Sequence, residues 1–237
     1  MKKKRKILGV ALSAAALMAA SVFGTMAYLT DTGAVSNTFT VGKVYISLDE
    51  ADVNEAGQPL KDGKIVEKVD EADRWTPTDK EPSQKYHLLP GHSYTKDPTV
   101  TVEAGSEKAY VRMMAKVTYK AAADDVFAKY KTDNLFAPWL DIHGDWAYKG
   151  DPVTTKDETA GTISRTYEFR YKTTVAKSET ATELPALFTT LTVPGGVTND
   201  EIAYLENMVI SVEAHAIQAA GFNDADAAWA AFVGKQN

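Results

Sequence analysis

Apolar and polar positions alternate with a period of two in several parts of the chain. In residues 109–119 every odd-numbered position is apolar, whereas the even-numbered positions include Arg112 and Lys116. Residues 165–172 repeat the pattern, with aromatic side chains on one face and polar ones on the other. Such alternation is typical of a strand with one buried face and one solvated face. We therefore predict a strand in each of these segments.

The alternation also predicts which substitutions the fold tolerates. Val111→Asp or Phe169→Asp would place an unpaired charge in a sheet core and abolish soluble folding. Arg112→Ser and Glu168→Gln would not, because these residues lie on the solvated faces of the same predicted strands.

Further segments carry weaker strand patterns, at residues 44–48, 99–103, 188–193 and 208–218. Gly and Pro fall in the gaps, as in Pro90-Gly91 and in the run that begins at Pro194. Short strands separated by such turns favour an all-β fold, namely an antiparallel sandwich of the jelly-roll or Greek-key kind. The length of the chain allows one core of this kind or two smaller ones.

Helices are a minor feature of the predicted fold. Short ones are expected at residues 124–131, 199–206 and 224–233. Thr198 and Glu201 have the spacing of a capping box. Residues 50–84 are rich in Gly, Pro and charged residues, which is typical of a long surface loop. We therefore expect a sandwich domain at residues 44–237 that carries a loop excursion at residues 50–84.

The first 27 residues have the layout of a secretory signal peptide. An uncharged stretch at residues 7–23 follows a positive segment made of Lys2, Lys3, Lys4, Arg5 and Lys6. As a helix this stretch would span about 25 Å, which is short for a permanent membrane anchor. Thr25 and Ala27 are small residues at the positions that a signal peptidase reads, so we predict cleavage before Tyr28 and a secreted mature protein.

Removal of the signal changes the charge of the protein. The whole chain has 26 Lys and Arg residues against 32 Asp and Glu residues. The signal holds five of the basic residues and none of the acidic ones, which leaves 21 against 32 and a formal charge of −11. So acidic a protein lacks the basic face that a nucleic-acid binder needs. The absence of cysteine excludes thiol catalysis, zinc–thiolate sites and disulfides.

The sequence contains no recognisable catalytic motif. No HExxH pattern, GxSxG nucleophile elbow or phosphate-binding GxxxxGK[ST] loop occurs, and the acidic runs lack the spacing of a calcium-binding EF-hand loop. His87 and His92 flank a turn, where two exposed histidines are a commoner arrangement than a metal site. His143 lies in a loop-like segment, and His215 is expected on the solvated face of a strand. We therefore predict no catalytic residue, no metal site and no cofactor.

Four tryptophans allow a carbohydrate-binding function to be considered. Aromatic side chains on a secreted sandwich serve either as platforms for sugars or as core and loop anchors. Each of these residues lies beside apolar neighbours or in a local cluster, which favours the anchoring role for Trp75, Trp139, Trp146 and Trp229.

A set of short motifs extends over nearly the whole chain. The junction of signal and mature chain reads GTMAYLTD at residues 24–31, followed by NTFTVGKV at residues 37–44. Downstream motifs are LPG at 89–91, KDPTVTV at 96–102, YVR at 110–112, AIQA at 216–219, GF at 221–222 and AAW at 227–229. Together they resemble the TasA/camelysin (CalY) family, whose precursors are cut by a SipW-type signal peptidase.

The resemblance implies a jelly-roll protein that Gram-positive bacteria export and that assembles into fibres of the extracellular or biofilm matrix. The implied partners are the SipW-type signal peptidase and other copies of the chain, with the membrane contacted only through the uncleaved signal. Camelysin relatives are described as cell-surface metallo-endopeptidases, so a peptidase is the alternative function, although this sequence has no recognisable zinc ligands. A secreted adhesin or carbohydrate-binding module is the third.

The start of the mature chain, residues 28–43, is the predicted assembly element. Residues 30–37 are polar and have little apolar surface to hold them against their own domain. Phe39 and Val41 then alternate with threonines and form a short amphipathic strand. A sandwich with an open edge could accept this strand from a neighbouring molecule, with pockets for Phe39 and Val41. The alternative is that the segment pairs within its own sheet as an ordinary first strand.

Overall fold

Antiparallel sheets dominate the fold, and the helices are short. The computed structural model describes residues 30–33, 44–70, 73–76, 84–130 and 139–232. The strands and helices of this part of the chain confirm the all-β class. The finer jelly-roll connectivity stays a prediction.

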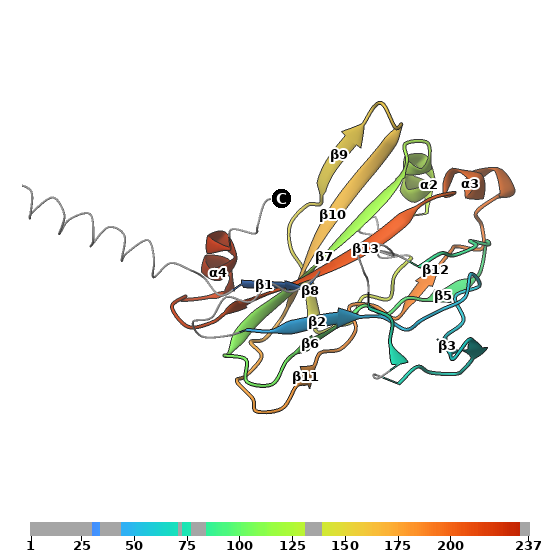
Figure 1. The fold of residues 1–237 in the computed structure, drawn as a ribbon. Helices are drawn as coiled ribbons and strands as arrows, with labels where there is room; N and C mark the ends of the chain where they lie inside the picture. Colours follow the sequence, from blue (N-terminus) through green and yellow to red (C-terminus); the bar gives the residue numbers. More distant parts are fainter. Residues whose placement is uncertain (1–29, 34–43, 71–72, 77–83, 131–138, 233–237) are drawn as a thin grey trace, which may run out of the picture.

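The largest sheet among the described residues has six antiparallel strands (Figure 1). Its order is β1-β13-β7-β10-β8, and β9 pairs with β10 as well. The strands are β1 (Thr30–Gly33), β7 (Ala109–Lys120), β8 (Trp146–Tyr148), β9 (Val153–Asp157), β10 (Thr162–Tyr171) and β13 (Val209–Gln218). The strands predicted at 109–119, 165–172 and 208–218 are thereby confirmed.

Smaller antiparallel sheets complete the described strands. One has the order β11-β6-β2, the second pairs β12 with β5, and the third pairs β3 with β4. Their bounds are β2 (Ile46–Asp49), β3 (Leu60–Lys61), β4 (Lys64–Ile65), β5 (Ser93–Thr95), β6 (Thr99–Val102), β11 (Thr182–Glu183) and β12 (Thr190–Thr192). The predicted strands at 44–48, 99–103 and 188–193 therefore exist, with ends shifted by at most two residues.

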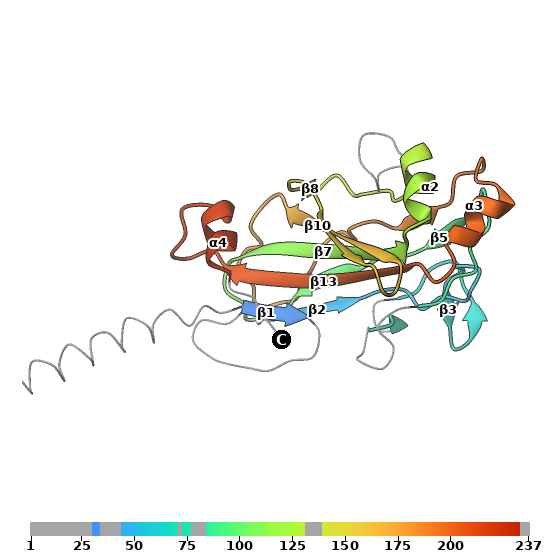
Figure 2. The same ribbon diagram turned by 90° about the horizontal axis from the view of Figure 1, so that it is seen from above.

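The main core lies against the alternating face of β7. Val111, Met113 and Val117 are at most 1% exposed, whereas the even-numbered positions of the strand are half-buried or exposed. They belong to one apolar cluster with Val100 of β6 and with Phe188, both fully buried. Figure 2 shows β13 beside β7 in the large sheet, and β2 contributes side chains to the same core. Burial of each such side chain stabilises the fold by about 1.5–3 kcal/mol.

The described helices are α2 (Ala123–Lys129), α3 (Asn199–Tyr204) and α4 (Ala225–Ala231), which confirms the predicted helices. The predicted capping box is present at the start of α3. The Glu201 amide donates to Thr198 Oγ1 at 3.3 Å, and the Thr198 amide donates to Glu201 Oε2 at 2.8 Å. Both bonds satisfy amide groups that the first helical turn leaves without partners.

The 50–84 excursion contains secondary structure of its own. β3 and β4 form a hairpin around Asp62 and Gly63, whose φ angles are 51° and 71°. Two consecutive positive φ angles are what a two-residue type I′ turn requires, and the Asp-Gly pair supplies them. A small separate cluster buries Ala51, Val53 and Val69. The described part of the excursion is therefore a folded attachment to the end of β2.

Candidate functional site

The first candidate surface is the sheet edge where β1 lies. The predicted signal-peptidase residues Thr25, Ala27 and Tyr28, and the predicted assembly residues Phe39 and Val41, fall outside the described residues. Within the predicted assembly element, the described part is β1. It pairs antiparallel with one end of β13, in a register that runs from Thr30↔Ile217 to Gly33↔Ala214.

β13 is much longer than the strand that covers it. Its ten residues pair along their whole length with β7 on one side. On the other side, β1 pairs only with residues 214–217, and no other described strand pairs with residues 209–213 there. A partly covered edge strand presents backbone donors and acceptors to any further strand. In the described chain, residues 209–213 of β13 therefore pair with β7 alone.

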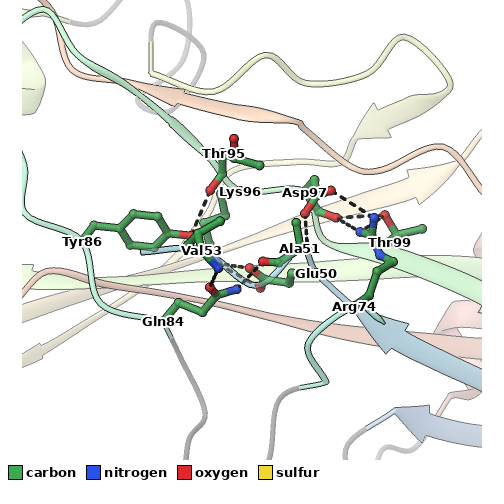
Figure 3. Close-up of polar contacts among 10 residues, drawn as sticks. All are labelled: Glu50, Ala51, Val53, Arg74, Gln84, Tyr86, Thr95, Lys96, Asp97 and Thr99. Carbon is green, nitrogen blue, oxygen red and sulfur yellow. Dashed lines mark hydrogen bonds and ion pairs between the residues drawn. The ribbon is translucent and has the colours of Figure 1, made fainter. Parts of the chain in front are cut away.

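The second candidate surface is a polar network at the end of β2 (Figure 3). Glu50 directly follows β2, and its amide and carbonyl exchange hydrogen bonds of 2.8 and 2.6 Å with the backbone of Trp75. Further along, the Gln84 side chain accepts from the Val53 amide at 2.8 Å and donates to the Ala51 carbonyl at 2.7 Å. Both ends of the excursion thus bond to the backbone that continues β2.

Arg74 holds the excursion to the neighbouring strand as well. Its guanidinium forms an ion pair with Asp49 and lies 3.1 Å from a carboxylate oxygen of Asp97. It also donates to the Asp97 carbonyl at 2.8 Å and to the Thr99 hydroxyl at 2.9 Å. The side chain is only 10% exposed, so these bonds replace nearly all of its hydration. Burial raises the pKa of Asp49, and the hydrogen bond and charge of Arg74 oppose this shift.

A buried ion pair lies beside this network. Lys96 Nζ donates to both carboxylate oxygens of Glu50, at 2.9 and 2.8 Å, and the two side chains are 3% and 5% exposed. Tyr86 donates to the Thr95 carbonyl at 3.1 Å, and burial raises the pKa of its hydroxyl. Breaking such a pair by removing one partner leaves a buried charge without compensation, so the pair fixes the position of Glu50 firmly.

The predicted histidine positions do not converge on a common site. His87 and His92 are both exposed, as expected beside a turn. His143 Nδ1 accepts from the Asp145 amide at 3.2 Å. Within the described ranges, no three His, Asp or Glu side chains lie close enough to hold one metal ion. Of the helices in those ranges, none is both long enough and apolar enough to cross a membrane.

His215 is not on an open face as predicted, because α4 covers it. The His215 ring stacks on Phe232 with 5.0 Å between centroids, and its Nδ1 accepts from Arg112 Nε at 3.2 Å. The Arg112 guanidinium lies 4.4 Å from the centroid of the Trp229 ring and 4.7 Å from that of Phe232. Burial lowers the pKa of Arg112, and the charge of Glu168 opposes this shift. This cluster therefore attaches α4 to the outer face of the large sheet.

Three of the tryptophans have the anchoring role predicted for them. Trp139, Trp146 and Trp229 are 2%, 4% and 5% exposed, which leaves little ring surface for a sugar. Trp146 also donates from its indole nitrogen to the Pro185 carbonyl at 2.9 Å. The fourth, Trp75, forms the backbone bridge to Glu50 described above.

Sequence reasoning missed the residues of the β2 network. Arg74 and Gln84 lie within a segment that was expected to be a surface loop, and no local pattern separates them from its other polar residues. Lys96 stands in one of the family-like motifs, but that motif gives no partner for it. A lysine that is nearly fully buried always needs a partner, yet its burial is visible only in the structure.

Three comparisons complete the description of the chain. Neither the models of protein families, nor the curated proteins, nor the solved structures contain a match to it. Function is therefore argued from the two sheet edges and from the motifs at the start of the mature chain.

Proposed function

We propose that this chain is a secreted, self-associating structural protein of the extracellular or biofilm matrix. In this proposal a SipW-type signal peptidase releases the mature protein, which then forms fibres or joins them. The observation that carries the proposal is the edge of β13, where β1 is the one described strand on that side and pairs with four of the ten positions.

The short pairing of β1 makes its replacement by the same strand of another molecule physically reasonable. An incoming strand would form the same backbone hydrogen bonds, so little free energy separates pairing within one molecule from pairing between two. Pairing between molecules is head-to-tail, because the donor and acceptor surfaces differ, and such contacts extend into a filament unless they close into a ring. Signal removal acts as the trigger, because the strand is tethered near the membrane until then.

The motifs at the start of the mature chain support the proposal further, since they resemble those of a family of matrix proteins. No contact among the described residues favours a metallo-endopeptidase or a carbohydrate-binding module over self-association. These two functions stay as alternatives. Stoichiometric zinc with EDTA-sensitive casein cleavage would point to the first, and glycan binding by a protein that stays monomeric would point to the second.

The proposal is tested with the purified mature protein. We expect fibres by electron microscopy from residues 28–237, and none after deletion of residues 28–41, although the shortened protein should still bind to and cap fibres of the intact protein. Lys156→Ser on the exposed strand β9 is the matched control and should leave fibre formation unchanged. Normal fibres without residues 28–41, or an unfolded deletion variant, would exclude exchange of the N-terminal strand.

A further inference from the structure

The residues of β13 that pair with β1 are also the residues that α4 covers. β1 pairs with residues 214–217 along the edge of the sheet. On the outer face of the same residues, Ile217 is fully buried in an apolar cluster with Ala228 and Trp229 of α4. His215 lies on this face as well and stacks on Phe232, directly after α4. Figures 1 and 2 show α4 and β1 at this one end of β13.

The other half of β13 has neither cover. No described strand pairs with residues 209–213 on the side of β1. On the outer face, Val209 is 41% exposed and the Glu213 side chain is 68% exposed. The end of β13 that accepts a strand at its edge is therefore the end that a helix restrains from the outer face.

Contacts with three strands attach α4 to the sheet. The Arg112 guanidinium of β7 lies 4.4 Å from the centroid of the Trp229 ring, and Ile217 of β13 packs in the same cluster as that ring. Arg170 of β10 forms an ion pair with Asp226 in the first turn of the helix. A helix as short as α4 is not stable in water by itself, so it depends on these contacts.

We propose that α4 positions residues 214–217 of β13 for the strand that pairs with them, with Trp229 and Phe232 as the positioning residues. An edge strand loses backbone freedom when a further strand pairs with it. A helix that already restrains these residues lowers that entropic cost, because the acceptor is ordered before the strand arrives. The inference rests on the proposed function in one respect, since under that function the arriving strand is β1 of a second copy of the chain.

The test removes the two rings in the full mature protein. The variants are Trp229→Ala and the double variant Trp229→Ala with Phe232→Ala, whereas Trp229→Phe keeps an apolar ring at the same position. Tyr204→Ala is the matched control, because it removes a 44% exposed aromatic ring from α3. Hydrogen exchange is measured at low protein concentration.

Three sets of amides report on three parts of the molecule. The Ala228 amide donates to the Asp224 carbonyl at 3.2 Å and reports on α4. The β1 amides report on the pairing with β13, and the β7 and β10 amides report on the rest of the large sheet.

In the two alanine variants we expect the Ala228 amide and the protected β1 amides to exchange at least about 10-fold faster than in the parent, because the acceptor end of β13 has lost its restraint. The β7 and β10 amides should keep the parent rates. Trp229→Phe should retain most of the protection, and Tyr204→Ala should retain all of it.

Three results would overturn the proposal. One is faster exchange at Ala228 with unchanged β1 amides, which would show that α4 and β1 are independent. Another is unchanged exchange at Ala228 in the double variant, since the rings would then not hold α4. The last is an equal increase at the β7 and β10 amides, which would mean that α4 stabilises the whole domain.

Electron microscopy of the parent protein separates this inference from the proposed function. If the parent forms no fibres but its β1 amides respond to the loss of the rings, the positioning role stands and the fibre function fails. If the parent forms fibres and its β1 amides do not respond, the fibre function stands and the positioning role fails.

Discussion

At the scale of single residues, the buried face of β7 admits no charge. Val111 is 1% exposed between Ala109 and Met113 on the same face, so a carboxylate there would have no partner and no water. We expect Val111→Asp to cost several kcal/mol, a large part of a total stability of about 5–15 kcal/mol, and to abolish soluble expression. Lys116→Ser on the exposed side of the same strand should leave the melting temperature within a few degrees of the parent value. Equal melting temperatures would contradict the alternation.

Arg112 shows the limit of that reasoning at the same scale. The alternation places it correctly on the outer face of β7, and from this alone Arg112→Ser is expected not to abolish soluble folding. In the structure the guanidinium lies against the rings of Trp229 and Phe232 and donates to His215. The premise that this face of β7 is open to solvent at Arg112 is wrong. The period of a strand shows on which face a residue lies, but it does not show which other element packs on that face. Arg112 is therefore a contact residue of α4.

At the scale of elements, α3 provides a prediction of pH dependence. Glu201 accepts hydrogen bonds from Lys129 at 2.6 Å, from the Thr198 amide at 2.8 Å and from Tyr130 at 3.1 Å, and these lower its pKa from 4.5 to about 2. A depressed folded-state pKa contributes stability above the unfolded value, and this contribution is lost as the pH falls from about 4.5 to about 2.

The measurement is hydrogen exchange at the Ile202 amide, which donates to the Thr198 carbonyl at 2.9 Å. After correction for intrinsic rates, we expect less protection at pH 2 than at pH 5 in the parent protein. Glu201→Gln cannot titrate and should show nearly the same protection at both values. A pH effect of equal size in the Gln variant would place its origin elsewhere.

β9 explains why some elements escaped prediction. All five of its residues are exposed, so neither face selects apolar side chains and no alternation appears in the sequence. β5, β8 and β11 have only two or three residues each, which is too short for any period to be recognised. Long strands with one buried face were found from sequence, and short or fully exposed strands were not.

At the level of the whole molecule, the proposed function requires export before assembly. We predict that the mature chain begins at Tyr28, as N-terminal sequencing of secreted protein would show. Thr25→Phe together with Ala27→Phe should leave the precursor in the membrane, because bulky side chains do not fit the small-residue positions of the peptidase. Met26→Phe lies between these positions and is the matched control. A start before Met26 or after Asp31 would show that the cleavage site is elsewhere.

Local patterns along the chain were enough to predict the class of the fold, the long strands, the short helices and the capping box of α3. These features depend on local periodicity and on side chains that bond within a few residues, so they are written in consecutive positions. The chain also has the layout of a signal peptide and the motifs that led to the proposed function, which no contact among the described residues tests.

The contacts that cover each edge and face of the sheets became visible in the folded structure alone. Glu50 contacts Trp75 and Lys96, and Arg112 contacts His215. These partners are separated by 25 to 103 residues in the sequence, so no local pattern identifies them. Burial of charge makes such contacts specific, because a buried ion without a partner costs several kcal/mol and must find one wherever the chain brings it. The excursion had the composition of a loop because several of its residues are polar. Two of them, Arg74 and Gln84, bond to residues at and just after the end of β2, which are close to them only in the folded chain.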